Sequence, residues 1–273
     1  MPHEVFTARL EQKDCISEAA QCFHFQFVLQ EPESFPFMPG QFISAVAEDA
    51  RGKQQTRAYS LASAPSGNRI ELCVNRVEAG FFSNHLADLP DDPDELLPVG
   101  GKIHVHGPHG HFTLRDPITD SILVATGTGV APMRSFLQSL FPASGEDRSN
   151  GKQIWLVYGT RHETELYYRE EFEALERRVP NFHYLPTLSR PLGEWTGLRG
   201  YVQDHVARIV EHRAAELGQA LPLPPPDASI PPAELRFDIN AYICGLNEMV
   251  AGVRDRMAGF GWHRKKIIFE RYD

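Results

Sequence analysis

The chain has 273 residues, 42% of them hydrophobic, and its 27 Lys and Arg against 36 Asp and Glu give a formal net charge of −9. This length exceeds one usual domain, and the apolar content can fill two cores, which excludes a disordered chain. The acidic balance argues against a nucleic-acid partner but leaves room for a local basic patch. With neither an N-terminal leader pattern nor an apolar run long enough to cross a bilayer, we expect a cytoplasmic protein without a membrane span.

Residues 1–116 are predicted to form an antiparallel β domain. Short strands with alternating aromatic residues, such as Cys22–Val28, are separated by Pro and Gly turns such as Pro36–Gly40. Gln41–Val46 supplies the next strand. Such a pattern is expected of a closed or nearly closed barrel.

Several segments of this domain suit a ligand that carries phosphate and a flat ring. Arg57–Ser63 alternates an arginine, a tyrosine and hydroxyl groups. Arginine can hold a phosphate by two parallel hydrogen bonds and tyrosine can lie against a heteroaromatic ring, although an exposed strand face is the alternative. Leu72–Val77 is predicted as a strand and Gly80–Leu86 as a glycine turn that enters a helix, again an anion-binding arrangement. His106–Leu114 is predicted to be a bent loop that ends the domain.

A nucleotide site is predicted at Ser121–Pro132. The uncharged aliphatic run indicates a strand buried on both faces, and Gly127 and Gly129 allow a tight turn and close approach of the backbone. A helix that begins near Pro132 would direct its free amides and its dipole at a phosphate. The motif reads G-x-G-x-x-P and lacks the third glycine of the usual dinucleotide fingerprint, so a turn without a ligand is the alternative.

Residues 117–273 are predicted to form an α/β domain with a parallel sheet. Ser189 and Arg190 follow its third strand, at the carboxyl ends where open parallel sheets bind ligands. A proline-rich surface loop is predicted at residues 217–234, because so many prolines suit neither a helix nor a central strand. Beyond Ser121–Pro132, strands are predicted at Gln153–Arg161, Asn181–Leu188, Ala241–Gly245 and Lys266–Glu270, and helices from Pro132 to Phe141, over Glu165–Leu175 and from Leu246.

Six motifs in this order resemble the ferredoxin–NADP reductase superfamily, and together they span nearly the whole chain. The resemblance implies a six-stranded antiparallel barrel that binds FAD, followed by a parallel sheet with helices that binds NAD(P)H. One departure is that Asp273 follows Tyr272, whereas plastid-type members end on the tyrosine. The motifs are Arg57-x-Tyr59-Ser60, Gly80-x-x-Ser83, Gly107-Pro-x-Gly-x-Phe112, Gly127-Thr-Gly-x-Ala-Pro132, Cys244-Gly245 and Glu270-Arg-Tyr272.

The resemblance also implies roles for individual residues. Arg57 and Ser83 bind the FAD pyrophosphate, while Tyr59 and Ser60 contact the isoalloxazine. Ser60, Cys244 and Glu270 are the candidate catalytic residues, and Tyr272 covers the flavin until the nicotinamide displaces it. The complete FAD set is Arg57, Tyr59, Ser60, Val74, Asn75, Arg76, Gly80, Phe82, Ser83 and Tyr272, and the NAD(P)H set is Gly127, Thr128, Gly129, Pro132, Arg161, Ser189, Arg190, Arg199, Tyr201, Cys244 and Gly245.

No metal site is predicted. The four cysteines have neither C-x-x-C nor iron–sulfur spacing, so each is interpreted as a small buried hydrophobe. For Cys244 the resemblance favours a place beside the nicotinamide over a purely structural one. Four histidines could suggest a metal cluster, but strand alternation puts only some of them on one face, so packing near the flavin nucleotide is preferred. They are His104, His106, His109 and His111.

The implied activity is a reductase that moves a hydride from NADPH to flavin N5 and then passes electrons singly to a separate carrier such as ferredoxin or flavodoxin, or works in reverse. NADPH is favoured because Arg161 stands where a carboxylate for the ribose 2′-hydroxyl would be expected. However, Trp195-x-Gly-Leu-Arg199-Gly-Tyr201 also resembles NADH-dependent oxygenase reductases. Further alternatives are a free-standing flavin or quinone reductase and a non-catalytic flavin-binding electron-transfer subunit.

Overall fold

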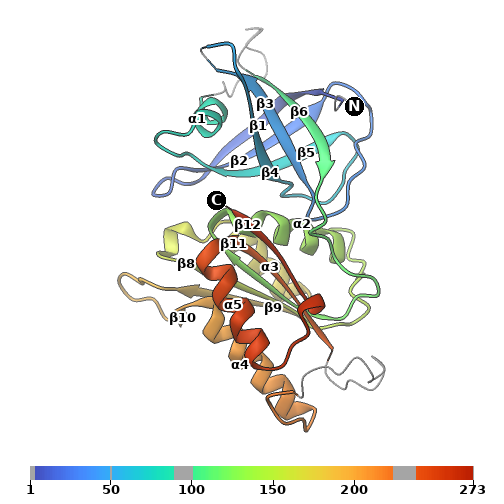
Figure 1. The fold of residues 1–273 in the computed structure, drawn as a ribbon, viewed down its shortest axis with the longest axis vertical. Coiled ribbons are helices and arrows are strands. Elements are labelled where there is room, and N and C mark those ends of the chain that lie inside the picture. The colour runs from blue at the N-terminus through green and yellow to red at the C-terminus, as the bar shows by residue number, and fades with distance from the viewer. Residues whose placement is uncertain (1–3, 50, 89–100, 224–237, 273) are drawn as a thin grey trace. The chain divides into compact units, whose positions relative to one another are not determined.

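The computed structural model describes residues 4–49, 51–88, 101–223 and 238–272. Contacts within the chain divide it into two compact units, Met1–Leu114 with Ala131–Ser144, and Arg115–Val130 with Gly145–Asp273 (Figure 1). Residues 224–234 of the predicted proline-rich loop, and Asp273, lie outside the described residues. No helix among the described residues is long and apolar enough to span a membrane.

The first unit is an antiparallel barrel of six strands in the order β4-β3-β6-β1-β2-β5. Leu61, just beyond the last residue of β4, bridges to Leu72 of β5, so the two outer strands meet and the sheet closes. The predicted antiparallel barrel is therefore confirmed. The strands are β1 (Phe6–Ser17), β2 (Cys22–Leu29), β3 (Phe42–Glu48), β4 (Gln54–Ser60), β5 (Arg69–Asn75) and β6 (Lys102–His109), and one short helix, α1 (Phe81–Ala87), follows β5.

Large apolar side chains fill the barrel. Phe25 and Phe27 of β2 are fully buried and stack with their ring centroids 6.0 Å apart. Ile43 and Ile70 from other strands are equally buried. Each of these side chains contributes about 1.5–3 kcal/mol by leaving water, so the interior is a packed core that leaves ligand binding to the outside and ends of the barrel.

The expectation of a bent loop from His106 onward was wrong in its first half. Strand β6 continues through His109, because its pairing with β3 runs from the pair Val46–His104, across one register shift, to the pair Phe42–His109. The imidazoles of His106 and His109 lie in contact, Nδ1 to Nε2 at 2.7 Å. The strand ends before Gly110, whose φ of +95° suits glycine.

Helix α2 (Val130–Leu140) supplies residues 131–140 to the first unit, although the sequence analysis placed them in the second domain. Arg134 on this helix donates to the carboxylate of Glu71 at 2.6 Å and to the carbonyl of Ala62 at 2.7 Å. Ser135 donates to the carbonyl of Ser63 at 2.6 Å. These buried and part-buried polar contacts explain why the helix groups with the barrel.

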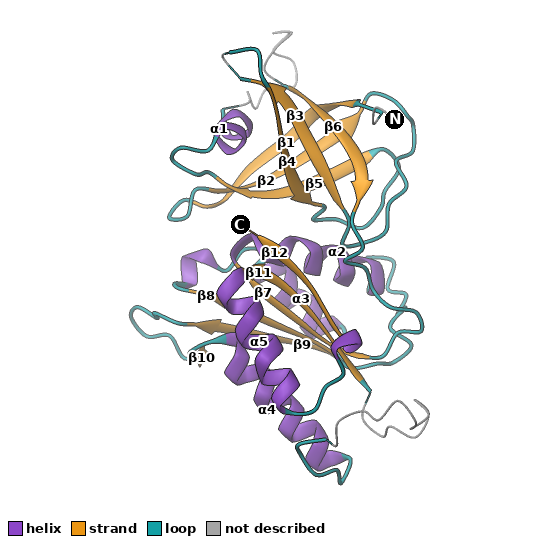
Figure 2. Ribbon diagram, in the orientation of Figure 1, coloured by secondary structure: helices purple, strands orange, loops and turns teal. Residues whose placement is uncertain are grey.

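The second unit is a parallel sheet of six strands in the order β10-β9-β8-β7-β11-β12. The predicted parallel sheet is confirmed, and β10 is a sixth strand that the sequence pattern did not indicate. Helices α4 and α5 cover one face, where their apolar residues share a core with β7 and β11 (Figure 2). The elements are β7 (Asp120–Thr126), β8 (Ile154–Thr160), α3 (Arg169–Arg178), β9 (Phe182–Leu188), β10 (Leu198–Arg199), α4 (Val202–Glu216), β11 (Ile239–Leu246), α5 (Asn247–Gly259) and β12 (Ile267–Tyr272).

Cysteine burial was predicted correctly for three of the four thiols. Cys22, Cys73 and Cys244 are buried, whereas Cys15 is exposed. Cys15 lies near the end of β1 opposite Phe23, and neither of the two side chains belongs to the buried core of the barrel. The expectation for Cys15 was wrong because only part of β1 packs against that core, and the part that contains Cys15 does not.

Thiol labelling of the native protein at pH 8 is therefore expected to modify Cys15 alone, and labelling in denaturant all four cysteines. Partial burial of its sulfur and the neighbouring Glu18 raise the pKa of the Cys15 thiol. Because the thiolate is the reactive form, labelling should be slower than that of free cysteine and should accelerate as the pH rises toward that pKa. Mass spectrometry of the labelled protein measures this, with Cys15→Ser as the control. A second rapidly labelled cysteine would contradict it.

Candidate functional site

The second unit has its topological switch point at β7. From this central strand the chain moves outward through β8, β9 and β10, and then returns to β11 and β12 on the other side. Open parallel sheets bind ligands at the carboxyl ends of the two strands that flank such a point. Here these ends are Thr126, the last residue of β7, with the turn Gly127–Gly129 that follows it, and Cys244–Gly245 near the end of β11.

Glycines allow these two strand ends to approach each other. A Cβ added to Gly129 would lie 2.3 Å from the carbonyl oxygen of Cys244, and one on Gly245 would lie 2.4 Å from Oγ1 of Thr126. Gly127 has φ of +54° and has open space beside it. The glycine motif is thus required by close backbone packing as well as by any ligand.

Thr126 is a functional candidate that the sequence analysis missed. Its hydroxyl is buried at the switch point and has no hydrogen-bond partner among the described residues. Leaving such a group unsatisfied costs about 1–3 kcal/mol, which a polar group of a bound nucleotide would recover. Its place as the last residue of β7, directly before Gly127, was the available signal. This hydroxyl and the glycine-lined approach fit a dinucleotide.

Cys244, Glu270 and Tyr272 form one side-chain group in the second unit. The parallel register aligns Cys244 with Glu270 and Leu246 with Tyr272, so the three side chains share a face of the sheet. Burial raises the pKa of the Cys244 thiol far above its ordinary value, and the charge of Glu270 raises it further, against a hydrogen bond with Tyr272. Cys244 therefore carries its proton at neutral pH.

The carboxyl ends of β8, β9 and β10 bring the predicted 2′-phosphate residues together. The amide of Ser189 donates to the carbonyl of Thr160, and the amide of Arg190 to the carbonyl of Arg161, both at 3.0 Å. The guanidinium groups of Arg161 and Arg190 are exposed, and neither forms an ion pair with a carboxylate in the described ranges. Two unneutralised cations beside a serine hydroxyl suit a phosphate dianion.

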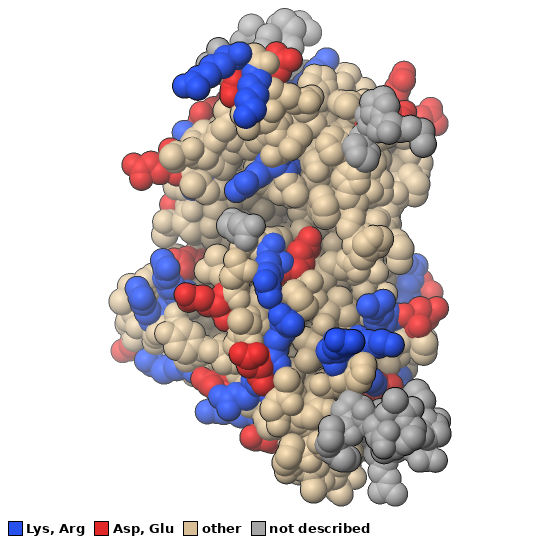
Figure 3. Space-filling model, in the orientation of Figure 1, with Lys and Arg blue, Asp and Glu red and all other residues tan. Residues whose placement is uncertain are grey.

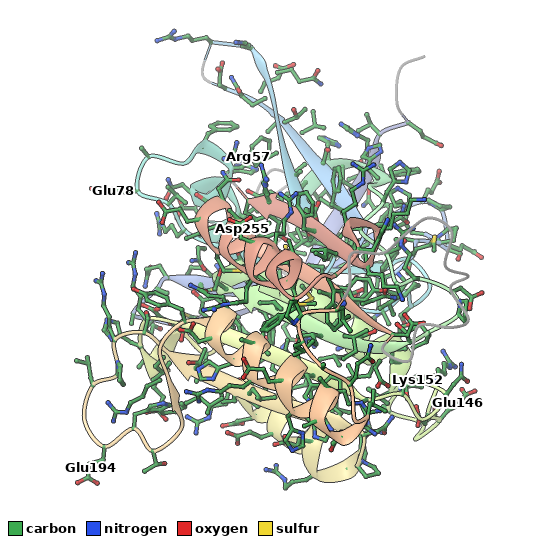
Figure 4. The ribbon with its side chains drawn as sticks, turned by 60° about the horizontal axis from the view of Figure 1, so that its bottom comes forward. Arg57, Glu78, Glu146, Lys152, Glu194 and Asp255 are labelled. Atoms are coloured by element: carbon green, nitrogen blue, oxygen red, sulfur yellow. The ribbon has the colours of Figure 1, made fainter. Side chains whose placement is uncertain are left out.

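Arg199 and Tyr201 complete this edge of the sheet. Arg199 of β10 aligns with Leu188 of β9 and donates to the carbonyl of Trp195 at 2.8 Å. Tyr201, directly before α4, is 63% exposed, a surface suited to stacking on adenine. Figure 4 shows Glu194 at the outer end of the loop between β9 and β10, pointing away from the sheet.

In the barrel, Arg57 and Tyr59 share one face of β4. Arg57 is exposed and forms no ion pair with a described carboxylate, and it projects from its strand in Figure 4. Tyr59 packs against the barrel core, and burial raises its pKa to about 12, partly offset by Arg57. The phenol is therefore neutral. Ser60, the next residue, is buried.

The other predicted FAD residues lie around the end of β5 and the start of α1. The hydroxyl of Ser83 accepts from the amide of Val77 at 3.0 Å and donates to the carbonyl of Gly80 at 3.4 Å, so it fastens this turn. Arg76 bonds to Asn84 at 2.7 Å and pairs with Asp88 at 3.1 Å. The side chains of Val74 and Phe82 belong to the barrel core, while Asn75 is half-buried at the strand end, so Val74 can offer a ligand only its main chain.

Two family models match the chain, an oxidoreductase FAD-binding domain over residues 7–114 and an oxidoreductase NAD-binding domain over residues 123–255. Fold and site thus define a two-domain flavin- and nicotinamide-dependent oxidoreductase. The chain is 36% identical to ferredoxin–NADP reductase B of Sorangium cellulosum (strain So ce56), over 99% of this chain and 98% of that protein. It belongs to the ferredoxin–NADP reductase superfamily, with one FAD-binding and one NAD-binding domain, and the predicted resemblance is confirmed.

Other relatives show how widely this architecture is used. The phenol hydroxylase P5 protein of Acinetobacter pittii (strain PHEA-2) is 34% identical over 68% of this chain, which spans 49% of that protein. A ferredoxin NADP⁺ reductase from Neisseria gonorrhoeae, solved with FAD and NADP, has a TM-score of 0.71 at 21% identity and covers 99% of both chains. That structure supports the fold.

Proposed function

We propose that this protein uses NADPH to reduce a separate one-electron carrier of the ferredoxin type, with FAD as the intermediary. The observation that carries the choice of NADPH is the pair of unneutralised guanidinium groups, Arg161 and Arg190, beside Ser189. An NADH site would instead need a carboxylate for the ribose 2′-hydroxyl. The carrier is inferred from the ferredoxin–NADP reductase that matches the chain over nearly its full length.

The barrel residues would bind and orient FAD. Arg57 supplies a charge-assisted contact to the pyrophosphate, and the turn that Ser83 fastens at Gly80 offers backbone amides. Tyr59, neutral and held by the core, gives the ring system a flat surface. Ser60, the next residue of β4, would supply a hydroxyl to the flavin ring system. Bound FAD takes up two electrons together and releases them one at a time.

The residues at the switch point would hold the nicotinamide nucleotide. Thr128 lies between the two glycines of the turn, and the amides that follow it toward Pro132 face the pyrophosphate. Thr126 offers its unpartnered hydroxyl to the nucleotide. Cys244 presents a protonated thiol, which avoids placing a nucleophilic thiolate against the oxidised ring. Because Tyr272 hydrogen-bonds with Cys244, a ring that enters beside the thiol must displace the tyrosine.

Cys244→Ala is expected to slow flavin reduction by NADPH by at least about tenfold while FAD stays bound, because a misplacement of the reacting ring by about 1 Å can cost about 100-fold in rate. The residue is fully buried, belongs to the second unit, and is not one of the barrel residues proposed to bind FAD. Stopped-flow absorbance of the flavin measures the rate, and Cys15→Ala is the control at an exposed thiol. A wild-type rate in Cys244→Ala would show that the thiol only fills space.

Turnover with a purified [2Fe–2S] ferredoxin tests the function as a whole. The wild-type protein should oxidise NADPH in the presence of ferredoxin and of the artificial acceptor ferricyanide. Activity with ferricyanide but not ferredoxin would contradict the carrier, and activity with neither would favour a non-catalytic flavin subunit. The likeness to the phenol hydroxylase P5 protein favours a second candidate, a reductase that serves an oxygenase. A higher kcat/KM for NADH than for NADPH would support that candidate.

A further inference from the structure

An exposed phenylalanine on the edge strand of the second sheet is bracketed by two arginines. Phe269 of β12 is 38% exposed. The guanidinium carbon of Arg254, on α5, lies 4.1 Å from its ring centroid, and that of Arg271, on β12, lies 5.3 Å from it. Such cation–π contacts hold both guanidinium groups at the surface in defined positions.

The two arginines keep their charge available. Neither Arg254 nor Arg271 pairs with a carboxylate within the ranges that the structure describes. Neighbouring cations do, since Arg256 pairs with Asp204 at 3.1 Å and Lys266 pairs with Asp238. Arg254 and Arg271 therefore carry charge that a carboxylate of another molecule can neutralise.

More positive charge adjoins this surface. Arg264 and Lys265 are exposed in the turn that leads into β12, and the exposed carboxylates on the same helix as Arg254 are Glu248 and Asp255. Figure 3 shows a column of Lys and Arg side chains over α5 and β12, with single acidic groups beside it. On a chain with a formal net charge of −9, this is a local basic surface.

The bracketed ring is separate from the nicotinamide residues. Successive residues of a strand point to opposite faces, so Phe269 and Arg271 lie on the face opposite Glu270 and Tyr272. The proposed hydride chemistry therefore makes no use of them. Arginine and aromatic side chains are the residues most enriched at the energetic centres of protein interfaces, and an exposed ring already fixed by its neighbours loses little entropy on binding.

We propose that Arg254, Phe269 and Arg271 form the docking site for an acidic one-electron carrier protein. Carboxylates of the carrier would bond to the two guanidinium groups, and Phe269 would pack against an apolar part of the carrier's surface. Charge complementarity favours this partner, because a local basic surface on a chain of negative net charge attracts and orients an acidic protein. The proposal rests on the proposed function, and names the surface that would hold its electron acceptor.

The test compares three acceptors with NADPH as donor, an acidic [2Fe–2S] ferredoxin, basic cytochrome c and neutral benzoquinone. In the double variant Arg254→Glu/Arg271→Glu, kcat/KM for ferredoxin should fall by about tenfold or more at low salt and lose most of its salt dependence. Benzoquinone reduction should stay at the wild-type rate, and cytochrome c reduction should be equal or faster. Phe269→Ser should weaken ferredoxin use without changing the salt dependence.

Arg177→Glu/Arg208→Glu is the matched control, since it makes the same change in net charge at exposed arginines on α3 and α4. FAD content and the circular dichroism spectrum check that each variant is folded. A ferredoxin kcat/KM within twofold of this control would overturn the docking site and leave the proposed function intact. A wild-type protein that reduces benzoquinone but not ferredoxin would overturn both.

Discussion

Replacing Arg57 by alanine is expected to leave a protein that purifies largely without its flavin. Arg57 is the exposed cation of β4 and has no ion-pair partner among the described residues, so its charge is available to the FAD pyrophosphate. A hydrogen bond to a charged group contributes about 1.5–3 kcal/mol, which corresponds to an FAD affinity weaker by about 10- to 150-fold. The ratio of flavin to protein absorbance and titration of apoprotein with FAD measure the loss.

Arg51→Ala provides the control for Arg57→Ala. Arg51 is also an exposed arginine, on the turn that precedes β4, and it is outside the proposed FAD set. Its removal changes the net charge equally and should leave the flavin bound. If Arg57→Ala retained FAD with the wild-type dissociation constant, Arg57 would be only an exposed strand residue, the alternative that its sequence context left open.

The division into a β-barrel and an α/β domain could be predicted, because the spacing of apolar residues along the sequence distinguishes the two kinds of strand. The alternating aromatic residues of Cys22–Leu29 and the aliphatic run of Asp120–Thr126 appear as a barrel strand and a buried parallel strand. Helix α4 was missed even though Val202, Val206, Ile209 and Val210 have helical spacing.

Other features depend on tertiary contacts that a linear pattern does not contain. Helix α3 begins at Arg169 rather than near Glu165, because Tyr168 takes a left-handed conformation and Glu165 instead accepts from the amide of Arg161. The burial of Thr126 without a partner follows from its neighbour Gly245 on another strand. The bracketed Phe269 likewise requires Arg254 from a different element. Motifs therefore predicted the ligand classes, while the structure was needed to find residues that act through packing.

Arg190→Ala is expected to raise KM for NADPH by about tenfold or more and to leave KM for NADH nearly unchanged. Arg190 and Arg161 follow adjacent strands, joined by the hydrogen bond from the amide of Arg190 to the carbonyl of Arg161. Only NADPH carries the 2′-phosphate, so the loss of about 1.5–3 kcal/mol from one charge-assisted contact appears with that nucleotide alone. Steady-state kinetics with both nucleotides and a fixed benzoquinone concentration measure the effect.

The pH dependence of the preference for NADPH, and the variant Arg161→Ala, provide further tests of whether these arginines bind the 2′-phosphate. A phosphate monoester loses its second negative charge below about pH 6, so the wild-type preference for NADPH should decline as the pH falls through that value and should decline less in Arg190→Ala. Arg161→Ala should reproduce the selective loss, whereas Arg177→Ala, an exposed arginine on α3, should change neither KM. Equal losses with both nucleotides in Arg190→Ala would mean that the residue supports the loop and does not read the phosphate. A wild-type kcat/KM higher for NADH would overturn the assignment of NADPH altogether.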